Sequence, residues 1–175
     1  ARRQRQMCIR DSLRAGQPGV HQHYLEGATT TLSDIRAGDE LFVWVYLDAQ
    51  DPPRELMLQF KAGADWNADG RRAYWGENLI GWGADNTPQR HRADATLPVR
   101  GQWVRVSVAA TALDLVGRTV NGIAFTLFDG AAAFGPCGKL RPSTTGPQPS
   151  ELPWFGASLP AVSYTHLRAH ETSLH

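Results

Sequence analysis

The chain has 175 residues, of which 42% are hydrophobic and 20% are charged, and its formal net charge at neutral pH is +1. This composition is typical of a single globular domain and excludes an intrinsically disordered chain. The sequence contains no apolar run of about 18 residues, so no transmembrane helix is expected.

Both ends of the chain look foreign to the protein. Residues 7–12 read MCIRDS and residues 163–172 read SYTHLRAHET, and both stretches resemble translated sequencing adapters at the ends of assembled metagenomic contigs. We therefore expect residues 1–12 and 163–175 to be artefactual and to lie outside the fold. These ends hold five basic and two acidic residues, which leaves 13 basic and 15 acidic residues between them. That balance excludes a basic surface for nucleic acid or an anionic membrane.

The sequence between the ends has the pattern of short β-strands. In chain order, strands are predicted at residues 20–25, 28–32, 41–47, 54–60, 71–75, 102–108 and 119–128, the last interrupted near Gly122. Residues 41–47 are apolar on both alternating faces, which predicts a central strand covered on both sides. Trp44 on this strand and Trp103 on a later one are expected in the core. Only residues 109–115 could form a helical turn.

Short strands separated by turns, without a helix long enough for a βαβ crossover, predict an all-β fold. We expect an antiparallel β-sandwich over residues 13–140. Residues 141–150 are rich in Pro, Ser and Thr and are expected to form a linker. Residues 151–162 become apolar again, which is consistent with the start of a next module.

Five stretches of the sandwich region carry a resemblance to known modules. They read HQHY at 21–24, ELFVWVYL at 40–47 with DPP at 51–53, RAYWGENLIGWG at 72–83, GQWVR at 101–105 and GIAFTLFDG at 122–130. This pattern resembles the concanavalin-A-like, jelly-roll modules of large bacterial secreted or envelope proteins, such as those with RHS/YD repeats. The resemblance implies a jelly-roll sandwich, a place in a tandem array, and an extracellular or cell-envelope location.

An aromatic and glycine-rich stretch is the candidate ligand site. Aromatic faces beside polar side chains are typical of sugar-binding surfaces, and glycines let a ligand approach the backbone closely. The candidate ligand-binding residues are Trp75, Asn78, Trp82, Asn86, Gln89 and Arg90. Trp82 stands between two glycines and is the ring expected to be exposed. The alternative is that Tyr74 and Trp75 belong to the core.

Two short motifs could bind metal. Asp65, Asn67 and Asp69 follow the first half of a calcium-binding loop, but the twelfth position is Gly76 instead of an acid, and an Asx-rich turn explains the same residues. Calcium is therefore a candidate cofactor, and a turn without a metal is the simpler alternative. The pair His21 and His23 has a spacing that can ligate a metal, or it marks an edge strand with polar residues facing water.

The single cysteine outside the foreign ends, Cys137, is expected to be a partly exposed thiol in a loop rich in Gly and Pro. Cys8 belongs to the foreign start, so no disulfide is expected between the two.

Motifs for catalysis are missing from the sequence. No predicted strand carries two carboxylates on one face, as glycosidases of this architecture do, and no nucleophile elbow or phosphate-binding loop occurs. We expect a non-catalytic binding module, with carbohydrate as the first ligand candidate, in a secreted or cell-surface multidomain bacterial protein. The expected partners are a glycan and the neighbouring modules. The alternatives are a structural spacer of a tandem array without a ligand and, third, a glycosidase-like enzyme.

Overall fold

The computed structural model describes residues 12–13, 18–26, 31–143 and 150–155. The strands are β1 (Ser12–Leu13), β2 (Val20–Glu26), β3 (Glu40–Leu47), β4 (Glu55–Lys61), β5 (Gly70–Gly76), β6 (His91–Asp94), β7 (Trp103–Ala109), β8 (Gly122–Phe128), β9 (Ala132–Arg141) and β10 (Ser150–Phe155). Within these described ranges there is no helix, and thus none that could cross a membrane.

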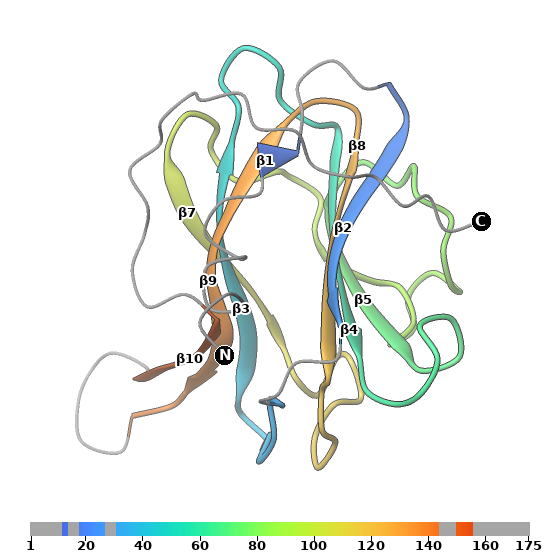
Figure 1. The fold of residues 1–175 in the computed structure, drawn as a ribbon, viewed down its shortest axis with the longest axis vertical. Coiled ribbons are helices and arrows are strands. Elements are labelled where there is room, and N and C mark those ends of the chain that lie inside the picture. Colours follow the sequence, from blue (N-terminus) through green and yellow to red (C-terminus); the bar gives the residue numbers. More distant parts are fainter. Residues whose placement is uncertain (1–11, 14–17, 27–30, 144–149, 156–175) are drawn as a thin grey trace.

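The strands form two sheets that face each other, as Figure 1 shows. The first sheet has the order β1-β9-β3-β7, with β10 also paired to β9, and the second has the order β2-β8-β4-β5-β6. All pairs are antiparallel except β5 with β6. The predicted all-β, antiparallel sandwich is therefore confirmed.

The core lies between the two sheets and follows the alternation of the strands. On β3, Leu41, Val43 and Val45 point inward and are fully buried. Leu58 and Phe60 of β4 belong to the same cluster from the opposite sheet. Burial of this apolar surface is the main force that holds the two layers together, at about 25 cal/mol for each Å² removed from water.

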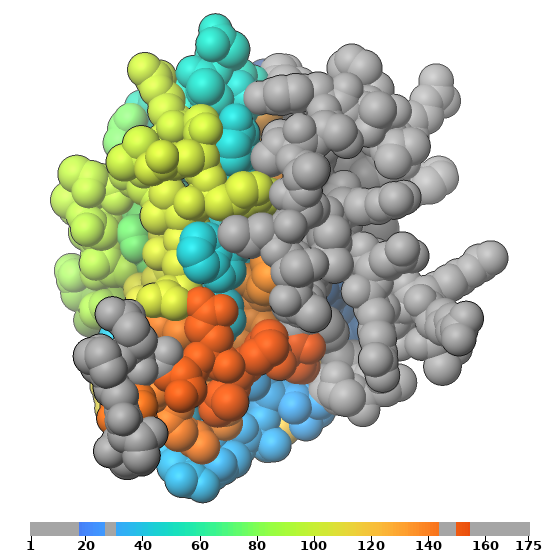
Figure 2. Space-filling view, turned by 90° about the vertical axis from the view of Figure 1, so that its left-hand side faces the viewer, coloured from blue at the N-terminus to red at the C-terminus, as the bar shows by residue number. Residues whose placement is uncertain are grey.

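The other face of β3 points away from the second sheet, which corrects the prediction for two tryptophans. Trp44 and Trp103 are only half-buried and lie on the outer face of the first sheet. The guanidinium of Arg105 lies 5.9 Å from the Trp44 ring centre, and the Trp103 ring lies 5.8 Å from that of Tyr46. Figure 2 looks onto this outer face, where atoms of β3 reach the surface between those of β7 and β10.

Strand β9 was not predicted, and it corrects the expectation for Cys137. The cysteine is fully buried, opposite Val43 of β3, and belongs to the central core. The register between β3 and β9 shifts between Val43 and Val45, where Gly135 and Pro136 stand in β9. Because of this irregularity, the strand can include a Gly-Pro pair, which from the sequence alone predicts a loop.

Residues 150–155, at the expected start of a next module, belong to the first sheet. They form β10, which pairs with β9 from Arg141 back to Cys137 and so extends the first sheet beyond the expected boundary at residue 140. A Cβ atom on Gly138 would lie 2.2 Å from the carbonyl oxygen of Leu152, so β10 can approach β9 this closely only beside a glycine. Residues 1–11 and 156–175 of the expected foreign ends and next module lie outside the described residues.

Smaller differences concern the connections. Leu32 pairs with Val120 in an isolated bridge, whereas residues 27–30 of the predicted strand 28–32 lie outside the described ranges. The predicted break near Gly122 is present, because β8 starts at this residue, after that bridge. Residues 110–114 form consecutive turns instead of a helix.

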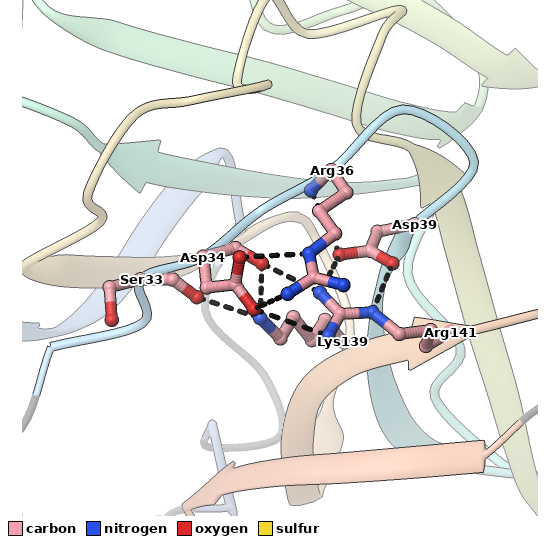
Figure 3. A network of polar contacts seen from close by, with 6 residues as sticks. All are labelled: Ser33, Asp34, Arg36, Asp39, Lys139 and Arg141. Atoms are coloured by element: carbon pink, nitrogen blue, oxygen red, sulfur yellow. Dashed lines mark hydrogen bonds and ion pairs between the residues drawn. The ribbon is translucent and has the colours of Figure 1, made fainter.

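A polar cluster ties the loop before β3 to the end of β9, and Figure 3 shows its side chains. Asp39 is 2% exposed and accepts two hydrogen bonds from Arg141, at 2.9 and 2.8 Å. Lys139 donates to the carbonyl oxygens of Ser33 and Asp34, at 2.7 and 2.6 Å. These contacts satisfy buried charges that would otherwise destabilise the fold.

Candidate functional site

Except for Trp75 on β5, the candidate ligand residues lie on the segment between β5 and β6, residues 77–90, on the outer side of the second sheet (Figure 1, green, at the right). Ile80 of this segment is buried against Met57 of β4 and Tyr74 of β5. These three side chains form a second, smaller core outside the sandwich, with Phe128 packed against it. The segment is therefore fixed to the sheet by packing.

A buried carboxylate anchors the start of the segment. Glu55 of β4 is 0% exposed, and its Oε2 accepts hydrogen bonds from the backbone N–H groups of Leu79 and Ile80, at 2.5 and 2.8 Å. Burial raises the pKa of Glu55, while the two N–H bonds and the charges of Arg90 and Arg92 oppose that rise. The carboxylate thus serves as the acceptor for backbone groups that have no strand partner.

A second carboxylate holds the far half of the segment. Asp85 accepts hydrogen bonds from the hydroxyl of Tyr74 and the amide of Asn78, both at 3.0 Å, and its Oδ1 lies 3.5 Å from Nε of Arg90. Burial alone would raise the pKa of Asp85, but the bonds from Tyr74 and the Asn86 backbone, with the charge of Arg90, lower it. Burial and the bond to Asp85 raise the pKa of Tyr74.

Trp82 is exposed on this anchored segment. Its exposed fraction is 37%, and Gly81 and Gly83 flank it. A Cβ atom on Gly83, where φ is +86°, would lie 2.7 Å from the carbonyl oxygen of Gln89, and one on Gly81 would lie 3.8 Å from Nη1 of Arg90. The backbone on both sides of Trp82 therefore runs close to Gln89 and Arg90.

The six predicted ligand residues separate into three groups. Trp75 is only 5% exposed and belongs to the core between the sheets, so its ring is not accessible to a ligand. Arg90 is largely buried and donates to the carbonyl oxygen of Ile80, at 3.1 Å, which gives it a structural part. Four predicted residues remain exposed on the segment: Asn78, Trp82, Asn86 and Gln89.

The sequence pattern did not indicate the anchoring residues Glu55, Tyr74 and Asp85. Glu55 on β4 and Asp85 on the segment stand 30 positions apart, and each reaches its partners only because β4 pairs with β5 and the segment folds over the sheet. A polar residue at the start of an otherwise apolar strand was the only available signal. A polar residue at that position is normally predicted to face water, because the sequence does not show that the segment covers Glu55.

The candidate calcium loop is built as a turn. Oδ1 of Asp65 accepts hydrogen bonds from the N–H groups of Asn67 and Ala68, at 2.6 and 3.1 Å, and Oδ2 of Asp69 accepts one from the N–H of Asp65, at 3.0 Å. Both carboxylates therefore bind their own loop, as in an Asx turn. Among the residues that the structure describes, no three His, Cys, Asp or Glu side chains are grouped to hold a metal ion.

The remaining aromatic and histidine candidates lie elsewhere. Trp66 packs edge-on against Tyr24 of β2, with ring centres 5.9 Å apart, on the outer face of the second sheet. His21 and His23 are half-buried and share the face of β2 whose neighbours on β8, such as Leu127, line the core. The prediction of an edge strand is correct, because β2 is at the edge of the second sheet. The prediction that the two histidines face water is wrong, because they lie on the same face as the core residues of β8.

Comparison of the chain with protein-family models, curated proteins and solved structures finds no match.

Proposed function

We propose that the chain is a non-catalytic carbohydrate-binding module of a secreted or cell-surface multidomain bacterial protein, with Trp82 as the ring on which a sugar stacks. The observation that carries the proposal is the exposed Trp82 on a segment held down by Glu55 and Asp85. The jelly-roll type, the location and the tandem array rest on the resemblance of residues 21–130 to modules of such proteins.

The chemistry of the exposed residues fits this role. The apolar C–H face of a sugar ring packs on an indole, and amide groups donate to and accept from sugar hydroxyls. Asn78, Asn86 and Gln89 supply exposed amides on the segment of Trp82. Because the segment is fixed before a ligand arrives, little conformational entropy is lost on binding, which favours measurable affinity from a small contact area.

The environments of Glu55 and Asp85 support a binding role over an enzymatic one. Glu55 and Asp85 have shifted pKa values in opposite directions, as the acid and base of a glycosidase would. However, Glu55 is fully buried, and its Oε2 accepts bonds from backbone N–H groups of the segment. We therefore assign these groups to positioning the segment and give neither a catalytic role.

Trp82→Ala tests the proposal. We expect binding to the glycans found by array screening of the wild type to fall at least about tenfold, by analogy with nucleobases, whose stacking on one aromatic side chain contributes roughly 1–3 kcal/mol. The free energy of unfolding should change by about 1 kcal/mol or less, because the ring is at the surface. Trp82→Phe keeps a flat ring and should retain part of the affinity.

The outcomes separate the alternatives. A stable wild type that binds no glycan would contradict the proposal and leave the structural spacer. A large loss of stability in Trp82→Ala without any binding to lose would place Trp82 in a structural role instead.

A further inference from the structure

Arg72 of β5 lies on the outer face of the second sheet, between two connections of the chain, and is 4% exposed. One connection is the Trp66 loop, residues 62–69, which joins β4 to β5. The other is the Trp82 segment, residues 77–90, which joins β5 to β6. Nη2 of Arg72 donates to the carbonyl oxygen of Trp66, at 3.3 Å, and Nη1 donates to that of Gln89, at 3.2 Å. One guanidinium group therefore binds both connections.

In the part of the chain that the structure describes, the partners of this guanidinium are backbone carbonyl oxygens and not carboxylates. Burial, followed by the charge of Arg71, lowers the pKa of Arg72, and its buried Nε has no hydrogen-bond partner. A buried charge is costly unless it is hydrogen-bonded, and losing one acceptor costs more than the bond itself contributes. The protein is therefore most stable when both connections keep their carbonyl oxygens on Arg72.

The Gln89 end of this bridge lies beside the backbone of Trp82. A Cβ atom on Gly83, the residue after Trp82, would lie 2.7 Å from the same Gln89 carbonyl oxygen that accepts the bond from Arg72. The backbone N–H of Arg72 also donates to the carbonyl oxygen of Pro88, at 3.2 Å. The backbone thus holds the segment next to β5, and the Arg72 side chain adds the connection to the other loop.

The Trp66 end of the bridge belongs to a loop with an ordered backbone. Gln59 of β4 donates to the same Trp66 carbonyl oxygen, at 2.6 Å. Oδ1 of Asp65 accepts hydrogen bonds from the N–H groups of Asn67 and Ala68 and so fixes the turn. The Trp66 loop contains none of the residues proposed to contact a sugar, so an effect of this loop on binding has to pass through another contact.

We propose that Arg72 is a positioning residue that couples the Trp66 loop to the Trp82 segment, so that order in the loop regulates glycan binding on the segment. The buried cation needs both carbonyl oxygens, so the two connections are ordered together. Coupling free energies are reciprocal, so a sugar bound on the segment also protects the loop. The regulation of binding rests on the proposed carbohydrate-binding function, whereas the coupling in the free protein does not.

Amide hydrogen exchange of the full chain tests the coupling without a ligand. Arg72→Met should speed exchange about tenfold or more in both connections, at amides such as those of Asn67 and Arg90, and leave β3 unchanged. Arg71→Met is the matched control, because Arg71 lies next to Arg72 on the other face of β5 and pairs with Asp114, at 3.6 Å. It should leave exchange in both connections unchanged.

A variant in the loop separates coupling from a general loss of stability. Asp65→Ala removes the acceptor of the turn, far from the sugar candidates, and should speed exchange at Arg90 about threefold or more. In the Arg72→Met background, Asp65→Ala should add nothing at Arg90, because the bridge is already absent. Additive effects in the double variant, or unchanged exchange at Arg90 in Asp65→Ala, would overturn the coupling whether or not a glycan binds.

The best glycan from array screening of the wild type tests the regulation. Its binding should slow exchange at Asn67 in the wild type but not in Arg72→Met, and Asp65→Ala should weaken its affinity about threefold or more. Unchanged affinity in Asp65→Ala would overturn the regulation and leave the proposed function intact. A folded wild type that shows the coupling but binds no glycan would overturn the proposed function and the regulation together.

Discussion

Glu55 lies buried on the outer face of β4, where its carboxylate accepts two backbone N–H groups of the Trp82 segment. Burial raises its pKa above the ordinary value of 4.5. The carboxyl group of Glu55 therefore binds its proton more tightly in the folded protein than in the unfolded chain. The resulting stability is fully present below pH 4.5 and is lost as the pH rises through the folded-state pKa.

Glu55→Gln should remove this pH dependence, because the amide keeps an oxygen acceptor for Leu79 and Ile80 but carries no ionisable group. Glu55→Ala should lose about 1–3 kcal/mol, since both buried N–H groups lose their acceptor. Urea unfolding of both variants and the wild type, at about pH 5 and about pH 8, gives the free energies of unfolding that test this prediction. An unchanged pH profile in Glu55→Gln would show that another group causes the dependence.

Trp44 lies on the outer face of the first sheet, so its removal should cost less stability than removal of a core aromatic. Its ring is half-buried under Arg105, so Trp44→Ala should lose about 1–2 kcal/mol, less than the roughly 3–5 kcal/mol of a large aromatic removed from a core. Phe60→Ala, inside the core, is the control for the full loss. Equal losses in the two variants would mean that the outer face is as tightly packed as the core.

At the scale of the element, β10 depends on a single glycine and a few side-chain contacts. It pairs with β9 beside Gly138, its Glu151 forms an ion pair with Arg105 across the first sheet, and Trp154 packs against the core. Surface ion pairs of this kind contribute little, so the close backbone approach at Gly138 is the sensitive point.

Gly138→Ala should displace β10 while the rest of the sandwich stays folded, because the added Cβ would meet the backbone of Leu152. We expect faster amide hydrogen exchange in residues 150–155 and unchanged exchange in β3 and β4. Gly81→Ala is the control glycine, because its Cβ would meet nothing closer than 3.8 Å. Protected amides in residues 150–155 of Gly138→Ala would contradict this account of β10.

At the scale of the whole molecule, the cluster of Figure 3 joins parts of the chain that are far apart in sequence. Asp39 and Arg141 stand 102 positions apart, yet they share two hydrogen bonds. The bonds from Arg141 lower the pKa of Asp39 below 3.8, although burial opposes this. The stability from Asp39 is therefore present above that value and is lost as the pH falls through the lowered pKa.

Asp39→Asn should destabilise the protein by about 1–3 kcal/mol at neutral pH and should reduce the loss of stability in acid. The Arg141 guanidinium keeps its second partner, Asp34, at 3.3 Å. Asp34→Asn, at the exposed edge of the same cluster, is the control and should have the smaller effect. Thermal unfolding across acidic pH compares them, and a larger effect in Asp34→Asn would contradict the assignment of Asp39 as the central partner.

Local patterns in the sequence were sufficient to predict most strands of the fold. They were also sufficient to predict the exposure of one residue of the candidate site, Trp82. Strands β3, β4, β7 and β8 have apolar residues at every second position, which is sufficient because burial on one face leaves that period in the sequence. Trp82 was predicted to be exposed from its two flanking glycines, which are local as well. Strand β9 was missed because its Ala, Gly and Pro residues show no such period.

Only the tertiary structure decided which faces and which distant residues come together. Both faces of β3 are apolar, so the sequence could not tell that Val43 faces the core and Trp44 the outside. For Trp75 the sequence left two alternatives, a ligand site and the core, and its place in the core follows from the pairing of β5 with β4. The contacts of Glu55 with Ile80 and of Asp85 with Tyr74 have the same origin. The pairing of strands and the cover over each face are set by long-range packing, which leaves no periodic signal in the sequence.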